Sequence, residues 1–323
     1  ELLLEAHALA LPEPDGYGRD AVARAVAACT QPAPSPVCEP PAVDLIVLVI
    51  EAFCDPRELG FEVEPDPIPT FRALGERAGR LRIASPAFGG LSANAEFELL
   101  TGMSMAFLPR DSCPYRQYVH GPLPALPRLL RERGWRTAAV HAEPLSYYGY
   151  SSIYPRLGFE QVISLSGEPG VELDAHGLRP SDAALARRLG ELSDASPDPL
   201  FAFAFANSTH WPWRRVESAP RFRILTPMGD AERTELEAYL QALHAADAAL
   251  AQLIAHFERP RSRPARIVVL GDHLPALSQR TYAAAGLHFE WTARRERLDF
   301  GQPDLETLRR MFDVPGRIWS SDG

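Results

Sequence analysis

Three long apolar runs constrain the fold of this chain most strongly. Polar residues follow each run, in one case after a single glycine. The runs span residues 43–50 (VDLIVLVI), 200–206 (LFAFAFA) and 267–270 (IVVL). Apolar runs of this length between helical stretches are typical of parallel strands that are buried on both faces. In open α/β sheets, chemistry is found at the carboxyl ends of such strands. We therefore expect a functional site where these runs end.

Stretches with helical patterns alternate with these strands. Helices are predicted over 20–28, from 71, and over 93–100, 123–134, 181–192 and 231–258; further strands are predicted over 81–84, 137–141 and 315–320. Glycines should end two of these helices, and Ser181 should cap the start of another. This alternation indicates an α/β fold with a mostly parallel central sheet and helices on both faces.

The length of 323 residues suits one large α/β domain or two smaller ones. Residues 1–41 hold a helical stretch and a proline-rich segment, so we interpret them as a lead-in and linker to a domain spanning 42–323. The net charge of −9 argues against a nucleic-acid partner, because binding to phosphates needs a concentrated basic face.

The start of the chain and its apolar runs bear on membrane association. No run approaches the roughly 20 residues that span a bilayer. The first residues lack both Met and the basic region of a signal peptide. We expect a processed or excised soluble portion, with any membrane tether outside these 323 residues.

Four cysteines bear on the cellular compartment. None forms a CxxC pair or has zinc-finger spacing, so a structural zinc is not expected. Cys29 and Cys38 flank a proline-rich turn, which suits a disulfide in an oxidising compartment. Four reduced thiols in a cytosolic enzyme are one alternative, and a pairing of Cys54 with Cys113 is another.

Two acidic positions after strands suggest a metal. Asp272-His273 follows Gly271 on a predicted sharp turn, and an oxygen ligand with an imidazole suits zinc or manganese. The alternative is a surface loop in which Asp272 caps the next residues. Glu51 ends the most apolar run, where a carboxylate is costly unless it is paired or binds a cation. The alternative is a sheet-edge glutamate paired with an arginine.

Two further residues could take part in chemistry. Ser92 follows Leu91 and two glycines and begins a predicted helix, where the helix dipole and free N–H groups favour an incoming phosphate. A simple N-cap is the alternative. His210 lies in the aromatic segment 207–213 (NSTHWPW), and a packed loop histidine is its alternative.

Together these segments resemble the alkaline-phosphatase superfamily, in particular its sulfatase-fold, lipoteichoic-acid-synthase-like branch. The stretch 90–102 (GLSANAEFELLTG) resembles the branch's G-x-[ST]-x-[ND]-x-E-F nucleophile segment. Glu51-Ala52-Phe53, Thr209-His210-Trp211-Pro212 and Gly271-Asp272-His273 match its E-S-[FL], S-H-x-P and G-D-H motifs. Residues 154–159 (YPRLGF) match the segment after the substrate loop. The resemblance covers at least residues 43–275.

The resemblance implies one divalent metal, Mn²⁺ or Zn²⁺, held by Glu51, Ser92, Asp272 and His273. It also implies that Ser92 is the nucleophile, with His210 and His141 contacting substrate. The branch usually has a tryptophan and an arginine that hold a phosphoglycerol head group, and ungapped alignment puts Tyr148 and Tyr150 there. Losing the arginine removes a bidentate phosphate clamp. The two tyrosines and Trp211 are expected to line the pocket.

The implied activity is transfer of phosphoglycerol or phosphoethanolamine from a phospholipid to an envelope glycan, through a phospho-Ser92 intermediate. The resemblance places such an enzyme in the periplasm, tethered to the inner membrane. A phosphodiesterase or phosphonate hydrolase of the same superfamily is an alternative, and a degenerate glycan-binding member is another. A sulfatase is disfavoured, because Ser92 lacks the C/S-x-P-x-R context.

Overall fold

The computed structural model describes residues 16, 18–29, 43–77, 79–109, 111–216, 219–289, 292–294, 297–299, 301 and 304–322. Its α-helices are α1 (Arg19–Cys29), α2 (Pro69–Arg77), α3 (Ser92–Thr101), α4 (Pro114–Gln117), α5 (Leu126–Arg131), α6 (Tyr150–Leu157), α7 (Asp182–Ala195), α8 (Asp230–Phe257), α9 (Gln279–Ala284) and α10 (Leu305–Phe312). Its strands are β1 (Asp44–Ile50), β2 (Val63–Glu64), β3 (Gly79–Ala84), β4 (Arg136–His141), β5 (Gln161–Ser164), β6 (Leu200–Ala206), β7 (Arg223–Ile224), β8 (Ala265–Gly271), β9 (Thr292–Arg294), β10 (Arg297–Asp299) and β11 (Asp313–Ser320).

A central seven-stranded sheet has the order β3-β11-β8-β1-β6-β4-β5. Strand β1 lies between β8 and β6 and is parallel to both, and β4 and β5 continue in the same direction. Strand β11 runs antiparallel to β8 and β3. The predicted, mostly parallel sheet is confirmed. Ile50 is in register with Ala206 and Gly271, so three strands end together at one edge.

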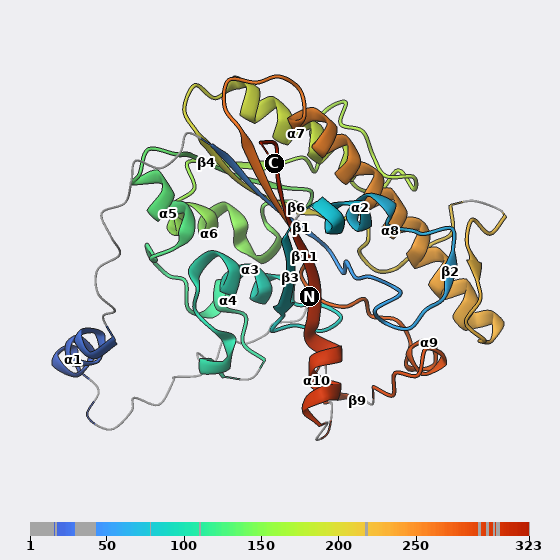
Figure 1. The fold of residues 1–323 in the computed structure, drawn as a ribbon. Helices are drawn as coiled ribbons and strands as arrows, with labels where there is room; N and C mark the ends of the chain where they lie inside the picture. Colours follow the sequence, from blue (N-terminus) through green and yellow to red (C-terminus); the bar gives the residue numbers. More distant parts are fainter. Residues whose placement is uncertain are drawn as a thin grey trace.

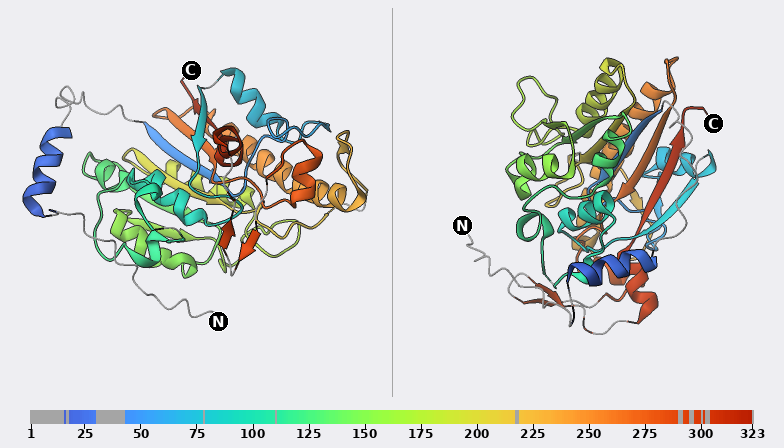
Figure 2. Two further views of the ribbon diagram at one scale, coloured as in Figure 1. Left: turned by 90° about the horizontal axis from the view of Figure 1, so that it is seen from below. Right: turned by 90° about the vertical axis from the view of Figure 1, so that its left-hand side faces the viewer.

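Helices cover both faces of this sheet. Figure 1 shows α3, α4, α5 and α6 on one side and α2, α7 and α8 on the other, and Figure 2 gives two turned views. Strand β6 illustrates the two cores, because its phenylalanines Phe201, Phe203 and Phe205 pack in the core with α3 and α6. Its alternating alanines pack in the core with α7 and α8. Small side chains on that face let the long helices lie close to the sheet.

The helix expected over 123–134 is shorter than predicted. Helix α5 begins only at Leu126, because Ala125 is extended and Pro127 can be accommodated only in the first turn. The expected ends at Gly102 and Gly134 both have positive φ, 70° and 89°. Ser181 caps α7 by accepting a hydrogen bond from the Ala184 N–H, as predicted.

The cysteines are only partly covered by the structure. Cys54 and Cys113 are buried and free, so the alternative pairing between them is wrong. Cys38 lies outside the described residues, so the pairing of Cys29 with Cys38 stays a prediction. In the part of the chain that the structure describes, no helix has both the length and the apolar composition needed to cross a bilayer.

Candidate active site

Four predicted residues from three separate parts of the chain come together at the carboxyl edge of the sheet. The Ser92 hydroxyl donates a 3.0 Å hydrogen bond to Glu51 Oε2 and lies 3.5 Å from His273 Nε2. The same Nε2 lies 3.4 Å from Glu51 Oε1 and 3.2 Å from Asp272 Oδ2. Glu51, Asp272 and His273 are all buried. Serine, two carboxylates and an imidazole therefore face one small volume.

The backbone around these residues is tightly constrained. Ala52, directly after Glu51, has a φ of 50°, a strained value for a residue with a side chain. Its N–H donates to Asp272 Oδ1 at 2.7 Å, which ties the end of β1 to the end of β8. A Cβ on Gly271 would lie only 2.2 Å from the Phe53 carbonyl oxygen. Gly271 is therefore needed for this close approach, rather than for a left-handed turn.

Ser92 is presented at the start of α3 by a run of unusual backbone. Gly89, Gly90 and Leu91 have φ values of 65°, 156° and 63°. Leu91, not Ser92, is the N-cap, and no side chain caps this helix. The interpretation of Ser92 as a simple N-cap is therefore wrong. The Ser92 residue is partly exposed, and its hydroxyl instead points to Glu51 and His273.

The electrostatics of the cluster favour a cation. Burial raises the pKa of Glu51 well above its ordinary value, and the nearby Asp272 carboxylate raises it further. Asp272 Oδ2 is buried without a hydrogen-bond partner among the described residues. His273 Nδ1 lies 2.9 Å from the Leu274 carbonyl oxygen, so Nδ1 donates to that oxygen and Nε2 is the nitrogen that faces the two carboxylates. Among the described residues, neither carboxylate forms an ion pair with an arginine or lysine.

These donors fit a divalent metal. Ligand atoms of Glu51, Asp272 and His273 all lie within 4.8 Å of one another. Around a tetrahedral ion with ligands at about 2.0–2.1 Å, neighbouring ligand atoms are separated by about 3.3–3.4 Å. His273 Nε2 lies 3.5 Å from Ser92 Oγ, 3.4 Å from Glu51 Oε1 and 3.2 Å from Asp272 Oδ2, and these three separations are close to that spacing. The unpartnered Asp272 oxygen would then gain a ligand bond.

This fit gives a prediction that does not depend on activity. Zn²⁺ or Mn²⁺ at about 100 times its Kd should raise the free energy of unfolding by about 2.7 kcal/mol. Asp272→Asn should remove most of that gain, because it takes away one anionic ligand. Thermal unfolding with and without EDTA measures the stabilisation by metal in the wild type and in Asp272→Asn, and elemental analysis measures the bound metal. Glu191→Gln is the control, since Glu191 is exposed on α7. A full metal response in Asp272→Asn would contradict the assignment.

His210 lies on the loop after β6, and this loop is anchored to the end of β1 at Glu51. The buried Thr209 hydroxyl donates to the Glu51 carbonyl oxygen. Burial lowers the pKa of His210, and the nearby charge of Arg179 lowers it further. Trp211 is 59% exposed, so its ring is open to a ligand. The neighbouring Trp213 packs on Tyr239 in the core instead.

Two other predicted substrate residues, His141 and Tyr150, are more deeply buried than Trp211. His141 is 2% exposed, and its ring lies between Phe205 and Tyr150, with centroid distances of 5.0 and 4.4 Å. Tyr150 does not wall a pocket as expected: it is 1% exposed, and its hydroxyl donates to the buried Glu96 at 2.8 Å. The first turn of α6 carries Tyr150 into the core. Substrate contact by His141 stays a prediction.

Tyr148 is nearer the surface. It has a φ of 48° and lies beneath the Arg116 guanidinium, 5.0 Å from the ring centroid. Both residues line a 320 Å³ cavity that also contains His120 and Arg156. Tyr148 therefore remains available to a ligand at that cavity.

Two charged residues at the site were missed by the sequence analysis. Arg179 Nε lies 3.5 Å from Glu143 Oε1, and Arg179 NH2 lies 3.5 Å from His210 Nδ1. The charge of Arg179 also lowers the pKa of Glu51. Arg179 comes from a loop without a recognisable motif, so no signal in the sequence singled it out. Glu143, two residues after His141, could have been noticed.

Comparisons with known proteins identify the family and the fold. The Sulfatase family matches residues 44–322. A Rhizobium meliloti (strain 1021) protein assigned to cyclic β-1,2-glucan modification is 33% identical over 310 residues, which is 95% of this chain. The match spans 46% of that relative, so the chain covers less than half its length.

Two solved structures share the fold. The phosphoglycerol transferase GacH of Streptococcus pyogenes, in complex with sn-glycerol-1-phosphate, has a TM-score of 0.68 at 21% identity, covering 87% of this chain and 68% of GacH. The C-terminal periplasmic domain of the phosphoethanolamine transferase EptC of Campylobacter jejuni has a TM-score of 0.57 at 15% identity, covering 88% and 80%. This chain belongs to the sulfatase family and has the alkaline-phosphatase-superfamily fold that its motifs predicted.

Proposed function

We propose that this chain is the catalytic part of a metal-dependent transferase. It would move a phospho-alcohol group, phosphoglycerol or phosphoethanolamine, from a phospholipid to an envelope glycan. The observation that carries the proposal is the hydroxyl of the partly exposed Ser92, which lies 3.0 Å from Glu51 Oε2 and 3.5 Å from His273 Nε2. The glucan-modification relative supports a glycan acceptor, and the two transferase structures support a phospho-alcohol donor.

The first half-reaction forms a covalent intermediate on Ser92. Glu51, Ser92, Asp272 and His273 would hold one Mn²⁺ or Zn²⁺, which supplies the Lewis acidity that lowers the pKa of the serine hydroxyl. Ser92 Oγ bonds to phosphorus while the bond to the diacylglycerol oxygen breaks, leaving a phosphodiester on Ser92. The serine proton ends on the departing diacylglycerol oxygen.

The second half-reaction needs a base for the acceptor. The lowered pKa of His210 favours its neutral imidazole, which can accept a proton from a sugar hydroxyl. That hydroxyl attacks phosphorus, the bond to Ser92 Oγ breaks, and the proton returns to the serine. Water in place of the sugar would make the protein a phosphodiesterase. We assign Trp211, 59% exposed beside His210, to contact with the acceptor sugar.

Such a reaction belongs outside the cytoplasm, where envelope glycans are modified. EptC, whose periplasmic domain has the same fold, is a precedent for a soluble domain that acts there. We propose the same periplasmic placement, next to the inner membrane that supplies the lipid donor. The tether would lie in a part of the protein outside these 323 residues.

Diacylglycerol release tests the proposal. Metal-loaded protein should release it from fluorescent phosphatidylglycerol or phosphatidylethanolamine, and the preferred lipid identifies the head group. Cyclic β-1,2-glucan added as acceptor should gain a mass equal to one phospho-alcohol group. Release without transfer to glucan would favour the hydrolase, provided that other envelope glycans also fail. The proposal is wrong if metal-loaded protein releases diacylglycerol from neither lipid.

A further inference from the structure

Arg179 brings a guanidinium to the active site from the loop before α7. Its NH2 lies 3.5 Å from His210 Nδ1, and its Nε lies 3.5 Å from Glu143 Oε1. Arg179 therefore lies beside the proposed substrate histidine, whose loop is bonded to the Glu51 carbonyl oxygen through Thr209.

The loop that carries Arg179 is well ordered by its own hydrogen bonds. Asp174 Oδ1 accepts from the N–H groups of His176 and Leu178, at 3.1 and 3.0 Å. The Asp174 N–H donates to the Arg179 carbonyl oxygen at 2.7 Å. Leu173 forms a β-bridge with Pro180, directly after Arg179. The backbone of Arg179 is thus fixed on both sides.

The Arg179 loop is also tied to the His210 loop. Asp182, the first residue of α7, is buried, and its Oδ1 accepts from the N–H groups of Asn207 and Ser208 at 3.0 and 3.1 Å. Ser208 Oγ accepts in turn from the Asp182 N–H at 3.3 Å. These bonds hold the two loops together, so the backbone segments that carry Arg179 and His210 keep a fixed relationship.

The Arg179 guanidinium makes only long polar contacts with the residues that the structure describes. These two contacts, with His210 and Glu143, are 3.5 Å long, whereas Arg72 bonds Asp55 at 2.8 and 3.0 Å. The Glu143 carboxylate is bound by Asn207 Nδ2 through the same oxygen, Oε1. The Arg179 side chain is 29% exposed, so a ligand can reach it. Five N–H donors beside a second basic group favour an anion.

Arg116, another arginine of the region, is occupied differently. Its guanidinium lies over the Tyr148 ring in the 320 Å³ cavity, and that cavity is not lined by His210 or any of the four proposed metal ligands. Position 150, where the family resemblance leads us to expect an arginine, holds a tyrosine bonded to Glu96. Arg179 is therefore the better-placed cation for a group that Ser92 attacks.

We infer that Arg179 binds a nonbridging oxygen of the phosphodiester donor, together with His210, and so supplies the phosphate-binding guanidinium that position 150 lacks. This inference rests on the proposed function, because it assigns a ligand to the same site. Arg179 makes the site selective for a phosphate group that can bind the guanidinium while its phosphorus faces Ser92. The substrate-binding arginine would thus come from the loop before α7 and not from position 150.

Binding of inorganic phosphate and sn-glycerol 1-phosphate to the metal-loaded protein tests this, by calorimetry. Arg179→Gln should raise Kd for both about 10- to 100-fold, since bonds between charged partners are strong. Arg179→Lys should give an intermediate loss, because it keeps the charge without the planar fork. Arg223→Gln is the matched control, an exposed arginine on β7 paired with Glu64. Its Kd should equal that of the wild type.

A double variant separates binding from loop support. If Arg179 only neutralises Glu143, then Arg179→Gln/Glu143→Gln should restore phosphate affinity; if it binds phosphate, affinity stays low. Metal content and thermal unfolding should match the wild type in each variant. If the Kd of Arg179→Gln for both anions lies within twofold of the wild-type value, the inference is wrong but the proposed function still stands. Arg179-dependent phosphate binding without lipid cleavage would support the inference and count against that function. Wild-type protein that binds neither anion would overturn both.

Discussion

Ser92→Ala should lower turnover of the phospholipid donor by about 10³-fold or more, because it removes the group on which the proposed covalent intermediate forms. Among the described residues, Ser92 is the one whose hydroxyl lies against both Glu51 and His273, at 3.0 and 3.5 Å. Steady-state release of diacylglycerol measures the loss. Mass spectrometry of wild-type protein quenched during turnover should find the phospho-alcohol on the peptide containing Ser92, and this adduct should be absent from the variant.

Two controls separate loss of the nucleophile from loss of the metal site. Ser92→Thr keeps the hydroxyl, so its turnover should stay within about tenfold of wild type. Ser92→Ala should still bind a metal, since Glu51, Asp272 and His273 remain within 4.8 Å of one another. A metal-loaded Ser92→Ala protein with full turnover would contradict the covalent mechanism and point to direct attack by the acceptor.

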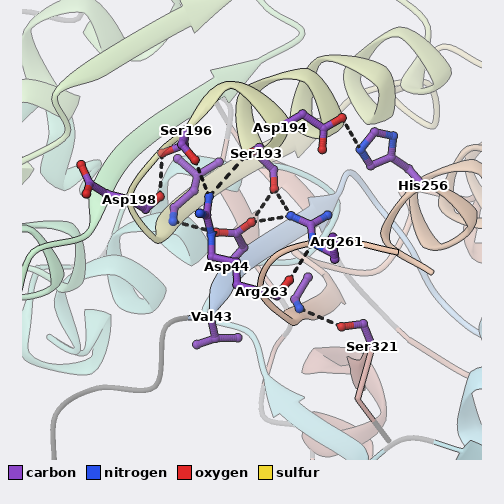
Figure 3. A network of polar contacts seen from close by, with 12 residues as sticks. Val43, Asp44, Ser193, Asp194, Ser196, Asp198, His256, Arg261, Arg263 and Ser321 are labelled. Atoms are coloured by element: carbon purple, nitrogen blue, oxygen red, sulfur yellow. Dashed lines mark hydrogen bonds and ion pairs between the residues drawn. The ribbon is translucent and has the colours of Figure 1, made fainter. Parts of the chain in front are cut away.

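Asp44→Ala should lower the free energy of unfolding by about 3–5 kcal/mol, because it leaves two largely buried arginines without their carboxylate. Figure 3 shows Asp44 at the start of β1, surrounded by Arg261, Arg263 and Ser193. Asp44 is fully buried and forms ion pairs of 2.6 Å with Arg261 and 2.7 Å with Arg263. It also accepts hydrogen bonds from the Leu200 N–H, at 2.9 Å, and from the Ser193 hydroxyl.

Urea unfolding measures this effect. Asp194→Ala is the control in the same region: Asp194 is 60% exposed in its pair with His256, so its loss should cost less than about 1 kcal/mol. Asp44→Asn keeps one acceptor oxygen, so its loss of unfolding free energy should lie between those of Asp194→Ala and Asp44→Ala. This variant can be measured even if Asp44→Ala does not fold. A cost below 1 kcal/mol for Asp44→Asn and Asp44→Ala alike would contradict the assigned role. Turnover per folded molecule should be unchanged, because Asp44 lies at the opposite end of β1 from Glu51.

Sequence patterns predicted the architecture because they are local. The alternation of apolar runs with helical stretches gave the mostly parallel sheet, and Ser181 gave the correct start of α7. The helix predicted from 123 failed for an equally local reason, since Pro127 restricts where a first turn can begin. Glu51, Ser92, Asp272 and His273 were recognisable because each lies in a short motif next to a strand or helix.

Other features depend on contacts between distant segments. Tyr150 was expected on a pocket wall, but α6 turns it toward Glu96, 54 positions earlier in the chain. Arg179 has no motif and becomes notable only because its loop packs beside His210, 31 positions later. Asp44 looks like a single charge in an apolar run until Arg261 and Arg263 fold over it, 217 and 219 positions away.

The sequence by itself therefore determined six of the seven strands of the central sheet, with β5 missed, most of the helices, the family and the identity of the proposed nucleophile and metal ligands. Periodicity and short motifs depend on neighbouring residues, so they can be read before folding. Only the tertiary structure decided which polar atoms face one another, which tyrosine is buried and which arginine reaches the site. Those outcomes follow from the packing of loops at the carboxyl edge of the sheet, where Ala52 and Asp272 meet across 220 positions.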